Sequence, residues 1–339
     1  MLIVVIIILA LFYSFLNGAN DRANAIATVT ATKALTPMKA ILLASIFNLA
    51  GACISTHVAE TIGKGIVSVE ALTTTIFLKV IICGLLGAII WTFICTRLGI
   101  PISVTHALIG GLIGAGISAG GIQVIRWNIL TNKVFLAIVL GPLWGFIIGA
   151  LIFAITDWIL YLFFKKIPSI KVERIFKWGQ IFSASFMSLS HGMNDTQNAM
   201  GVVTIALITG GFISSKNSGA HFSIPLWVMI SCGAAMGIGT FLMGWKVMQT
   251  IGWRLTRMEP KHGFSAETGA GIAVTIASLI GMPVSTTHVL GSSVIGGTFF
   301  QNLRRIRWSE VKRMVIAWII TIPLTAVIGA FTYWLIHSM

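Results

Sequence analysis

Two polar stretches of this sequence interrupt long apolar segments. NGANDRANA covers residues 17–25 and HGMNDTQNA covers residues 191–199, and each holds an Asn-Asp pair followed by another asparagine. The spacing places these side chains on one face of a helix. Carboxylate and amide oxygens in a cavity suit a hard cation such as sodium, and a carboxylate can instead take up a proton. The candidate cation ligands are Asp21, Asn24, Asp195 and Asn198, flanked by Asn20 and Asn194, with Asp21 and Asp195 as the carboxylates that sodium would use. A buried ion pair between Asp21 and Arg22 is the alternative for the first stretch.

A second pair of motifs carries hydroxyls instead of carboxylates. PISVTH covers residues 101–106 and PVSTTH covers residues 283–288, and a glycine-rich apolar segment follows each of them. Proline suits the first turn of a helix, and serine or threonine caps it. A helix N-terminus has unpaired N–H groups and the positive end of a dipole, so two such termini could surround a tetrahedral oxyanion. Ordinary capping is the alternative for either motif alone, and for His106 and His288 we expect a structural role.

These motifs need helices that can hold charges inside a membrane. The chain has 339 residues, of which 56% are hydrophobic and 9% are charged, whereas soluble domains carry roughly a quarter charged residues. Segments of about 20 apolar residues can cross a bilayer, and we expect ten crossings, near 1–32, 40–60, 72–96, 100–120, 134–164, 178–208, 224–248, 264–281, 283–300 and 314–337. The net charge of +14 would indicate nucleic acid in a soluble protein, but in this chain no nucleic-acid partner is expected.

The sequence also repeats itself. The Asn-Asp stretches recur at an offset of 174 residues, ETIG at 60–63 recurs as QTIG at 249–252, and the P-[IV]-S-x-T-H motifs recur at an offset of 182. Ordered matches of this kind indicate a duplicated unit. We expect a first membrane repeat at 1–165, a basic cytoplasmic linker at 166–177 and a second membrane repeat at 178–339.

The positions of the cations predict the orientation. With five crossings in each half, each P-[IV]-S-x-T-H segment counting as one, most lysines and arginines fall on the side of the linker. Only Lys64, Lys79, Arg126, Lys133 and Lys216 fall on the side of the termini. Because basic loops stay in the cytoplasm, both termini should be extracytoplasmic. An odd number of crossings inverts one repeat relative to the other. We therefore predict an all-α, polytopic membrane protein with two inverted repeats, broken helices at the Asn-Asp stretches and re-entrant-like P-[IV]-S-x-T-H segments.

Cation ligands and anion ligands drawn from both halves are typical of a co-transporter, and the residues resemble a known family. GANDRANAIAT, HGMNDTQNAMG, MEPKHGFSAETG (258–269) and PVSTTHVLGSSVIGG resemble the PiT family of inorganic phosphate transporters, particularly its compact bacterial members. The resemblance covers nearly the whole chain. It implies a secondary active transporter in the inner cell membrane that imports phosphate by proton or sodium symport with alternating access. It also implies a homodimer, and no cofactor beyond co-transported sodium ions.

The resemblance also implies roles for individual residues. Those that would line the substrate site are Asn20, Asp21, Asn24, Ser103, Thr105, Asn194, Asp195, Gln197, Ser285, Thr286 and Thr287, with His106, His288, Arg22, Asn48 and Glu267 in supporting positions. Arg22 and Asn48 depart from the family pattern, because many members have a small or apolar residue at the first position and some have an acid at the second. The missing acid at Asn48 leaves proton coupling open. Glu267 could serve a cation or proton, or lie at a solvated helix start.

The same motifs are compatible with other functions. A sulfate or other oxyanion permease of the same family is the alternative substrate class, but two aspartates favour phosphate, which keeps a proton at neutral pH and can donate a hydrogen bond to a carboxylate. A Ser-His-Asp hydrolase is disfavoured, because both copies are intact, serine and histidine lie three residues apart at a helix start, and no nucleophile elbow is present. A channel is the remaining rival. The expectation is a transporter and not an enzyme.

Overall fold

The structure is a computed structural model, and it describes residues 1–213, 222–299 and 301–338. The first half of the chain contains α1 (Leu2–Ala31), α2 (Pro37–Ala52), α3 (His57–Gly65), α4 (Thr74–Leu98), α5 (Val104–Gly120), η1 (Ile122–Val124), α6 (Trp127–Ile129), η2 (Leu130–Phe135) and α7 (Leu136–Phe163). The second half contains α8 (Ser169–Thr209), α9 (Leu226–Leu242), α10 (Trp245–Gln249), η4 (Thr250–Arg254), α11 (Pro260–Leu279), α12 (Thr286–Phe299), η5 (Leu303–Arg305) and α13 (Trp308–Ser338). The fold is all-α, as predicted.

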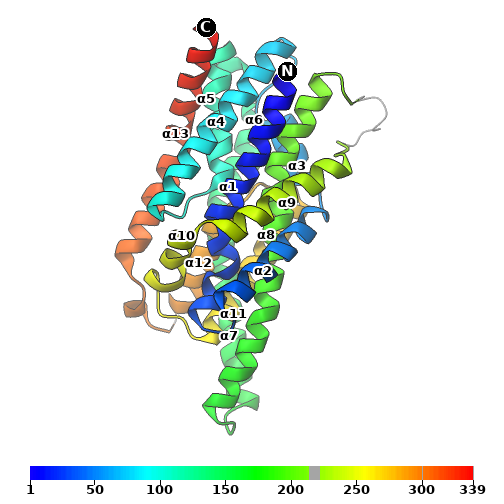
Figure 1. Cartoon of the computed structure of the whole chain (residues 1–339). Coiled ribbons are helices and arrows are strands. Elements are labelled where there is room, and N and C mark those ends of the chain that lie inside the picture. Colours follow the sequence, from blue (N-terminus) through cyan, green and yellow to red (C-terminus); the bar gives the residue numbers. More distant parts are fainter. Residues whose placement is uncertain (214–221, 300, 339) are drawn as a thin grey trace.

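The order of elements in the second half repeats that of the first half, turned upside down. In Figure 1, α1 runs from the end that carries both termini toward the opposite end, and α8 runs the other way. The same reversal relates α7 to α13. Both termini lie at one end of the molecule, and the connection between α7 and α8 lies at the other (Figure 1). The two repeats are therefore inverted relative to each other.

The Asn-Asp stretches do not break their helices, which corrects one prediction. Helix α1 is continuous through residues 17–25, and α8 is continuous through residues 191–199. A polar side chain costs a helix less than about 1 kcal/mol in propensity, so when its polar atoms find partners the helix continues. The broken helices are instead α2–α3, bent by 72°, and α9–α10–η4, bent by 68°.

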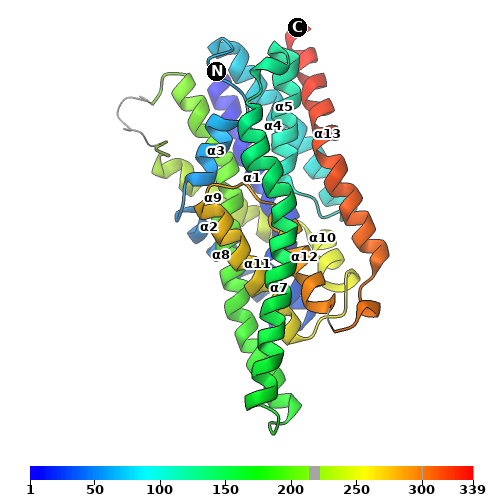
Figure 2. The same cartoon turned by 180° about the vertical axis from the view of Figure 1, so that it is seen from behind.

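The P-[IV]-S-x-T-H segments form the tips of two hairpins. Helix α4 descends from the end that carries the termini and α5 returns to it, whereas α11 and α12 make the same excursion from the opposite end (Figure 2). The motifs therefore add no net crossing, and the prediction of five crossings per half is wrong. In the described part of the chain, α1, α4, the continuous helix Trp127–Phe163 and α13 are long and apolar enough to cross a bilayer, or up to six spans if each bent pair counts as one; of these, α4 is an arm of the first hairpin. The first half starts at the end that carries the termini and finishes at the opposite end (Figure 1), so its number of net crossings is odd and the inversion is retained.

Glycines let the repeats cross closely at equivalent points. A Cβ on Gly18 of α1 would lie 2.0 Å from the carbonyl oxygen of Met236 in α9, and a Cβ on Gly192 of α8 would lie 2.1 Å from that of Asn48 in α2. Real Cβ atoms do not approach so closely, so only glycine fits. Small residues of this kind allow close helix packing in membranes. The same device at both crossings holds α1 and α8 at the centre of the molecule.

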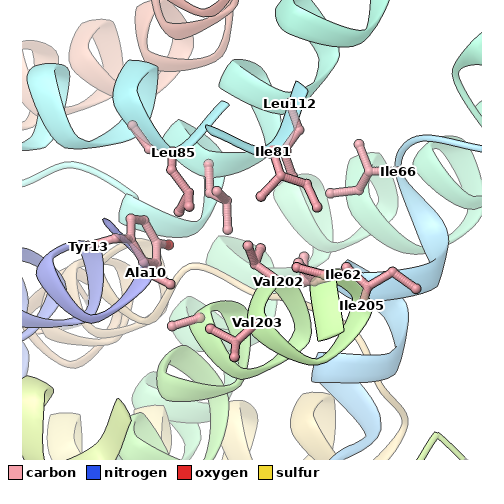
Figure 3. Packing of buried hydrophobic residues seen from close by; sticks show 14 of the residues in the cluster. Ala10, Tyr13, Ile62, Ile66, Ile81, Leu85, Leu112, Val202, Val203 and Ile205 are labelled. Atoms are coloured by element: carbon pink, nitrogen blue, oxygen red, sulfur yellow. The ribbon is translucent and has the colours of Figure 1, made fainter. Parts of the chain in front are cut away.

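The core packs tightly around these central helices. Figure 3 shows one cluster in which Tyr13 of α1, Leu85 of α4, Leu112 of α5 and Val202 of α8 converge. All four side chains are buried. This packing fixes the first hairpin against α1 and α8.

The predicted linker at 166–177 is mostly helical. Pro168 precedes α8, which starts at Ser169 and continues to Thr209. Lys171, Arg174 and Lys177 therefore lie in α8, whereas Lys166 precedes it. The division of the chain at 165 and 178 stays a prediction. Of the cations placed on the side of the termini, Lys216 lies outside the described residues.

Candidate functional site

The two hairpin tips meet between α1 and α8. His106 and His288 are the third residues of the tip helices α5 and α12, and their rings lie 5.0 Å apart at an interplanar angle of 75°. Ser103 and Ser285 cap these helices, since the Ser103 Oγ accepts from the His106 amide at 3.1 Å and the Ser285 Oγ accepts from the His288 amide at 3.3 Å. The predicted capping is confirmed at both motifs. The helix N-termini of both repeats therefore face one buried region.

Asparagines of the central helices bind the hydroxyls of the tips across the repeats. Asn24 Nδ2 of α1 donates to Thr286 Oγ1 at 3.0 Å and to Thr287 Oγ1 at 2.9 Å. Asn198 Nδ2 of α8 donates to Thr105 Oγ1 at 2.8 Å. The single bond at Thr105 reflects the missing hydroxyl in PISVTH, where Val104 occupies the position of Thr286. Each asparagine thus links its own repeat to the hairpin of the other repeat.

The two carboxylates lie in the same region. Thr287 Oγ1 donates to Asp21 Oδ1 at 2.8 Å, and Thr286 Oγ1 donates to Asp195 Oδ2 at 3.0 Å. Both aspartates are only 2% exposed. Asp21 does not take Arg22 as its ion-pair partner, because the Arg22 Nη1 donates to the Met243 carbonyl at 3.1 Å. The alternative of a buried Asp21–Arg22 pair is therefore set aside.

His191 lies between the carboxylates, and the sequence assigned it no role. Its Nε2 is 3.3 Å from Asp195 Oδ2 and 3.6 Å from Asp21 Oδ2, and its Nδ1 is 3.0 Å from Asn48 Oδ1. The signal for His191 was its position four residues before Asp195, on the same face of α8. The equivalent residue of the first repeat is Asn17, so the two repeats differ at this point.

The protonation of His191 can be assigned from its neighbours. Asn48 Nδ2 donates to Thr240 Oγ1 at 3.3 Å, and the Thr240 hydroxyl donates to backbone carbonyls, so Asn48 Oδ1 is an acceptor. The His191 Nδ1 therefore carries a proton. Its Nε2 faces two carboxylates, and an unprotonated nitrogen there would leave only acceptors facing one another. The arrangement needs a proton or a cation at this point.

The amide oxygens of Asn24 and Asn198 complete a donor set for a hard cation. Both Oδ1 atoms are buried and have no hydrogen-bond partner among the residues that the structure describes. A buried polar atom without a partner costs about 1–3 kcal/mol, so these oxygens suit a ligand that the protein itself does not supply. With the nearby carboxylate oxygens they match the preference of sodium for oxygen ligands. Ligand atoms of Asp21, His191 and Asp195 all lie within 4.8 Å of one another.

Asn20 and Asn194 bind the hairpins, and Asn194 also contacts the site, since its Nδ2, in the amide orientation that satisfies both its oxygen and its nitrogen, donates to Asp195 Oδ1 at 3.1 Å. Asn20 Nδ2 donates to Thr96 Oγ1 at 2.9 Å, and the Ile102 amide is 3.4 Å from Asn20 Oδ1. Asn194 bonds the Ser278 Oγ at 2.8 Å in either orientation of its amide. Thr96 and Ser278 end the descending helices of the two hairpins at equivalent positions. These asparagines therefore fix the tips against α1 and α8.

Gln197, Arg22 and Asn48 support neighbouring elements. Gln197 Oε1 accepts from the Ala59 amide at 2.9 Å, at the start of α3. Arg22 reaches the bend between α9 and α10, where its guanidinium also lies 5.6 Å from the ring centre of Trp245. Asn48 orients His191, as described above. Each of these contacts joins α1 or α8 to a broken helix of the fold.

Glu267 is buried in a separate polar cluster, so it does not lie at a solvated helix start. Its carboxylate accepts hydrogen bonds from Thr28 of α1 and from Ser183 and Gln180 of α8. Thr28 lies two helical turns from Asp21 along α1. The His288 ring stacks on Trp318 at 4.0 Å. Within the described part of the chain, the Nε2 atoms of His106 and His288 have no hydrogen-bond partner.

Comparison with known proteins identifies the family to which this arrangement belongs. The profile of the phosphate transporter family matches residues 17–329, which include both Asn-Asp stretches and both hairpin tips. The chain belongs to the phosphate transporter family. Its fold also matches a solved structure described as the sodium-dependent phosphate transporter, with a TM-score of 0.90, 28% identity, and coverage of 100% of this chain and 99% of that one.

Named relatives of this family member are transporters. A probable low-affinity inorganic phosphate transporter of Mycobacterium bovis is 39% identical over 336 residues, which cover 99% of this chain and 78% of the relative. A probable low-affinity inorganic phosphate transporter of Bacillus subtilis is 40% identical over 339 residues, covering 100% and 98%. The family consists of transporters and not of enzymes, in agreement with the prediction from sequence.

Proposed function

We propose that this protein imports inorganic phosphate together with a cation, by alternating access to one site between the hairpin tips. The observation that carries the proposal is the convergence of a carboxylate, an amide and a hydroxyl from each repeat, at Asp21 with Asn24 and Asp195 with Asn198. The relatives named as inorganic phosphate transporters support the choice of substrate.

Phosphate fits this donor set better than sulfate does. The tips offer threonine hydroxyls and helix N-termini to a tetrahedral anion. The two aspartates stand beside them, and an anion that keeps a proton can donate to a carboxylate, whereas sulfate is an acceptor only. A sulfate permease is the second candidate, and competition by sulfate tests it.

The negative charges of the proposed site are the reason for proposing a coupling cation. Two buried carboxylates and an anion repel one another unless positive charge enters with them, since charges inside a bilayer cost several kcal/mol. We propose that Asp21, Asn24, Asp195 and Asn198 bind this cation. The imidazole of His191 can carry a proton between the carboxylates, and the free amide oxygens can bind sodium. The solved neighbour described as sodium-dependent supports sodium.

We also propose that the α7–α8 connection faces the cytoplasm and that both termini are extracytoplasmic. Lys165, Lys166, Lys171, Arg174 and Lys177 cluster at the end opposite the termini, and cationic segments remain on the cytoplasmic side. The homodimer stays a prediction from the resemblance.

Uptake of radiolabelled phosphate into proteoliposomes tests the function. Sodium and proton gradients are imposed separately, and sulfate is added as a competitor. We expect accumulation against a phosphate gradient with one of the two ions and weak inhibition by sulfate. Uptake that does not depend on either the sodium gradient or the proton gradient would contradict the proposal of symport. A protein that exchanged label but never accumulated it would behave as a channel.

A further inference from the structure

The ETIG and QTIG repeats have no part in the proposed substrate site, yet they make equivalent contacts in the two halves. Thr61 Oγ1 in α3 donates to the Gly281 carbonyl at 2.8 Å, and Thr250 Oγ1 in η4 donates to the Gly99 carbonyl at 2.9 Å. Gly281 and Gly99 begin the loops of the hairpin tips, so each threonine binds the hairpin of the opposite repeat.

In both repeats the threonine hydroxyl donates its proton to the hairpin and not to its own helix. Thr61 Oγ1 is also 3.3 Å from the His57 carbonyl in its own helix, and Thr250 Oγ1 is 3.3 Å from the Lys246 carbonyl. A hydroxyl has one proton to donate, and the shorter contact goes to the glycine. The duplicated geometry shows that the threonines hold the tips and do not merely satisfy their own helices.

The glycines at these tips allow each tip to pack closely against a broken helix of the other repeat. Gly99 and Gly281 have φ values of +70° and +71°, which only glycine adopts without strain. A Cβ at Gly281 would lie 3.1 Å from the His57 carbonyl oxygen, and a Cβ at Gly99 would lie 2.9 Å from Lys246 Cβ. Each tip is therefore seated directly on the broken helix that carries its threonine.

A cavity ends at one of these contacts. It has a volume of about 390 Å³, and Thr61, Lys133 and Gly281 line it together with His57, Glu60 and Arg126. Its lining includes residues of α3 and α6, two helices that lie toward the end that carries the termini (Figure 1). The Thr61–Gly281 bond therefore stands between this cavity and the tip of the α11–α12 hairpin.

Lys133 strengthens this contact in one repeat only. Its Nζ donates to Thr61 Oγ1 at 3.3 Å, and the equivalent residue of the second repeat is Met314. Arg126 is committed elsewhere, since its Nη2 lies 2.6 Å from Glu70 Oε2. Lys133 lies in η2, a π-helical turn of a kind that is frequent at functional sites.

We propose that Thr61 and Thr250 are positioning residues that latch the two hairpin tips, and that release of each latch opens the central site toward one side only. The inference rests on the proposed alternating access. Release of Thr61 from Gly281 opens the site to the end of the termini, and release of Thr250 from Gly99 opens it to the opposite end, where α10 and η4 lie beyond the first tip (Figure 1).

Side-specific labelling of a buried cysteine tests the latches. Ser285→Cys is placed in a background in which Cys53, Cys83, Cys95 and Cys232 are replaced, and an impermeant methanethiosulfonate is applied from either side. We expect Thr61→Val to raise the labelling rate from the side of the termini about three- to tenfold, the effect of losing one hydrogen bond. Thr250→Val should do the same from the opposite side only.

Matched variants separate a latch from general loosening. Thr131→Val and Thr298→Val remove hydroxyls that bond only within their own helices, and neither should change either rate. Thr61→Ser keeps the hydroxyl and should restore the parent rate. Where Thr61→Val does not insert, Lys133→Met replaces it, with a smaller rise on the same side.

The result that overturns the proposal is an unchanged rate, or a rise from both sides, in both threonine variants. The labelling needs no phosphate flux, so its outcome is independent of uptake. A cysteine-free parent that inserts but fails to accumulate phosphate with either ion would count against the proposed function and not against the latches.

Discussion

At the scale of single residues, the site depends on charges that balance one another. Asp21 and Asp195 each accept a hydrogen bond from a threonine of the second tip, and His191 faces both of them. Replacing one of these three side chains leaves the other two buried without a partner. The free-energy cost of those unpaired groups is larger than the net contribution of the lost hydrogen bond.

The aspartates give the most direct prediction. Asp21→Asn and Asp195→Asn should each lower coupled phosphate uptake about ten- to hundredfold or more, because the lost charge removes the cation ligand and a charge-assisted hydrogen bond. Insertion, measured by the amount of protein in the membrane, should be unchanged. Asp157→Asn is the matched control, since Asp157 pairs with Lys261 outside the site. Full uptake in either site variant would remove the cation-site assignment.

His191 tests which ion is used. His191→Asn gives the second repeat the residue that the first repeat has at Asn17. If a proton on the imidazole balances the carboxylates, uptake driven by a pH gradient should fall about tenfold while any sodium-driven component persists. His57→Asn, at an exposed histidine, should change neither component. Equal proton-driven uptake in the variant and the parent would exclude His191 from proton coupling.

Sequence patterns predicted which residues lie together at the candidate site better than which contacts each of them makes. Duplication identified both aspartates, both capping serines and the threonines of the tips. It could not separate Asn24, which faces the site, from Asn20, which bonds the descending helix of a hairpin, because both lie on polar faces of α1. His191 was missed because its partners come from α1 and α2, and such contacts leave no local pattern.

At the scale of elements, the sequence predicted the number and order of the helical segments more accurately than the positions where helices break or turn back. Polarity in the Asn-Asp stretches was interpreted as a break, whereas cross-repeat partners satisfy those side chains and α1 stays continuous. The real breaks lie at residues 53–56, between α2 and α3, and at Met243 and Gly244, between α9 and α10, where Gly244 has a φ of +94°. The proline motifs predicted re-entrant-like segments, but hydropathy near 72–120 and 264–300 did not show that each pair of apolar segments turns back at its motif instead of making a net crossing.

The glycine crossings give a prediction for these elements. Gly18→Ala and Gly192→Ala each place a methyl group about 2 Å from a backbone carbonyl of α9 or α2, so the helices must separate. We expect each variant to lower the free energy of unfolding by about 1–3 kcal/mol, measured as earlier thermal unfolding in detergent. Gly297→Ala should be tolerated, because its nearest neighbour would be 3.6 Å away. Equal stability of all three variants would contradict the close crossing.

At the scale of the whole molecule, inversion sets which surfaces share a side. Figures 1 and 2 place both termini at one end and the α7–α8 connection at the other. The sequence predicted this relation because a hairpin that replaces two of the five predicted crossings in a half leaves the number of crossings odd. The number itself could not be derived, since hydropathy does not distinguish a hairpin from two spans.

Labelling from each side tests this arrangement. Single cysteines at Ser169 and Ser338, in a cysteine-free background, should react with an impermeant reagent from opposite sides of the membrane. The cysteine at Ser169 should react from the cytoplasmic side, in accordance with the basic cluster around it. Labelling of both positions from the same side would exclude an odd number of crossings.

The exchange of contacts between the halves has a consequence for any shorter version of this chain. Thr61 holds the tip formed by the second half, and Thr250 holds the tip formed by the first. Neither half can complete its own latch. A polypeptide of half the length could reproduce the central region only by associating with a copy of itself inserted upside down, so separately expressed halves should need each other to become stable.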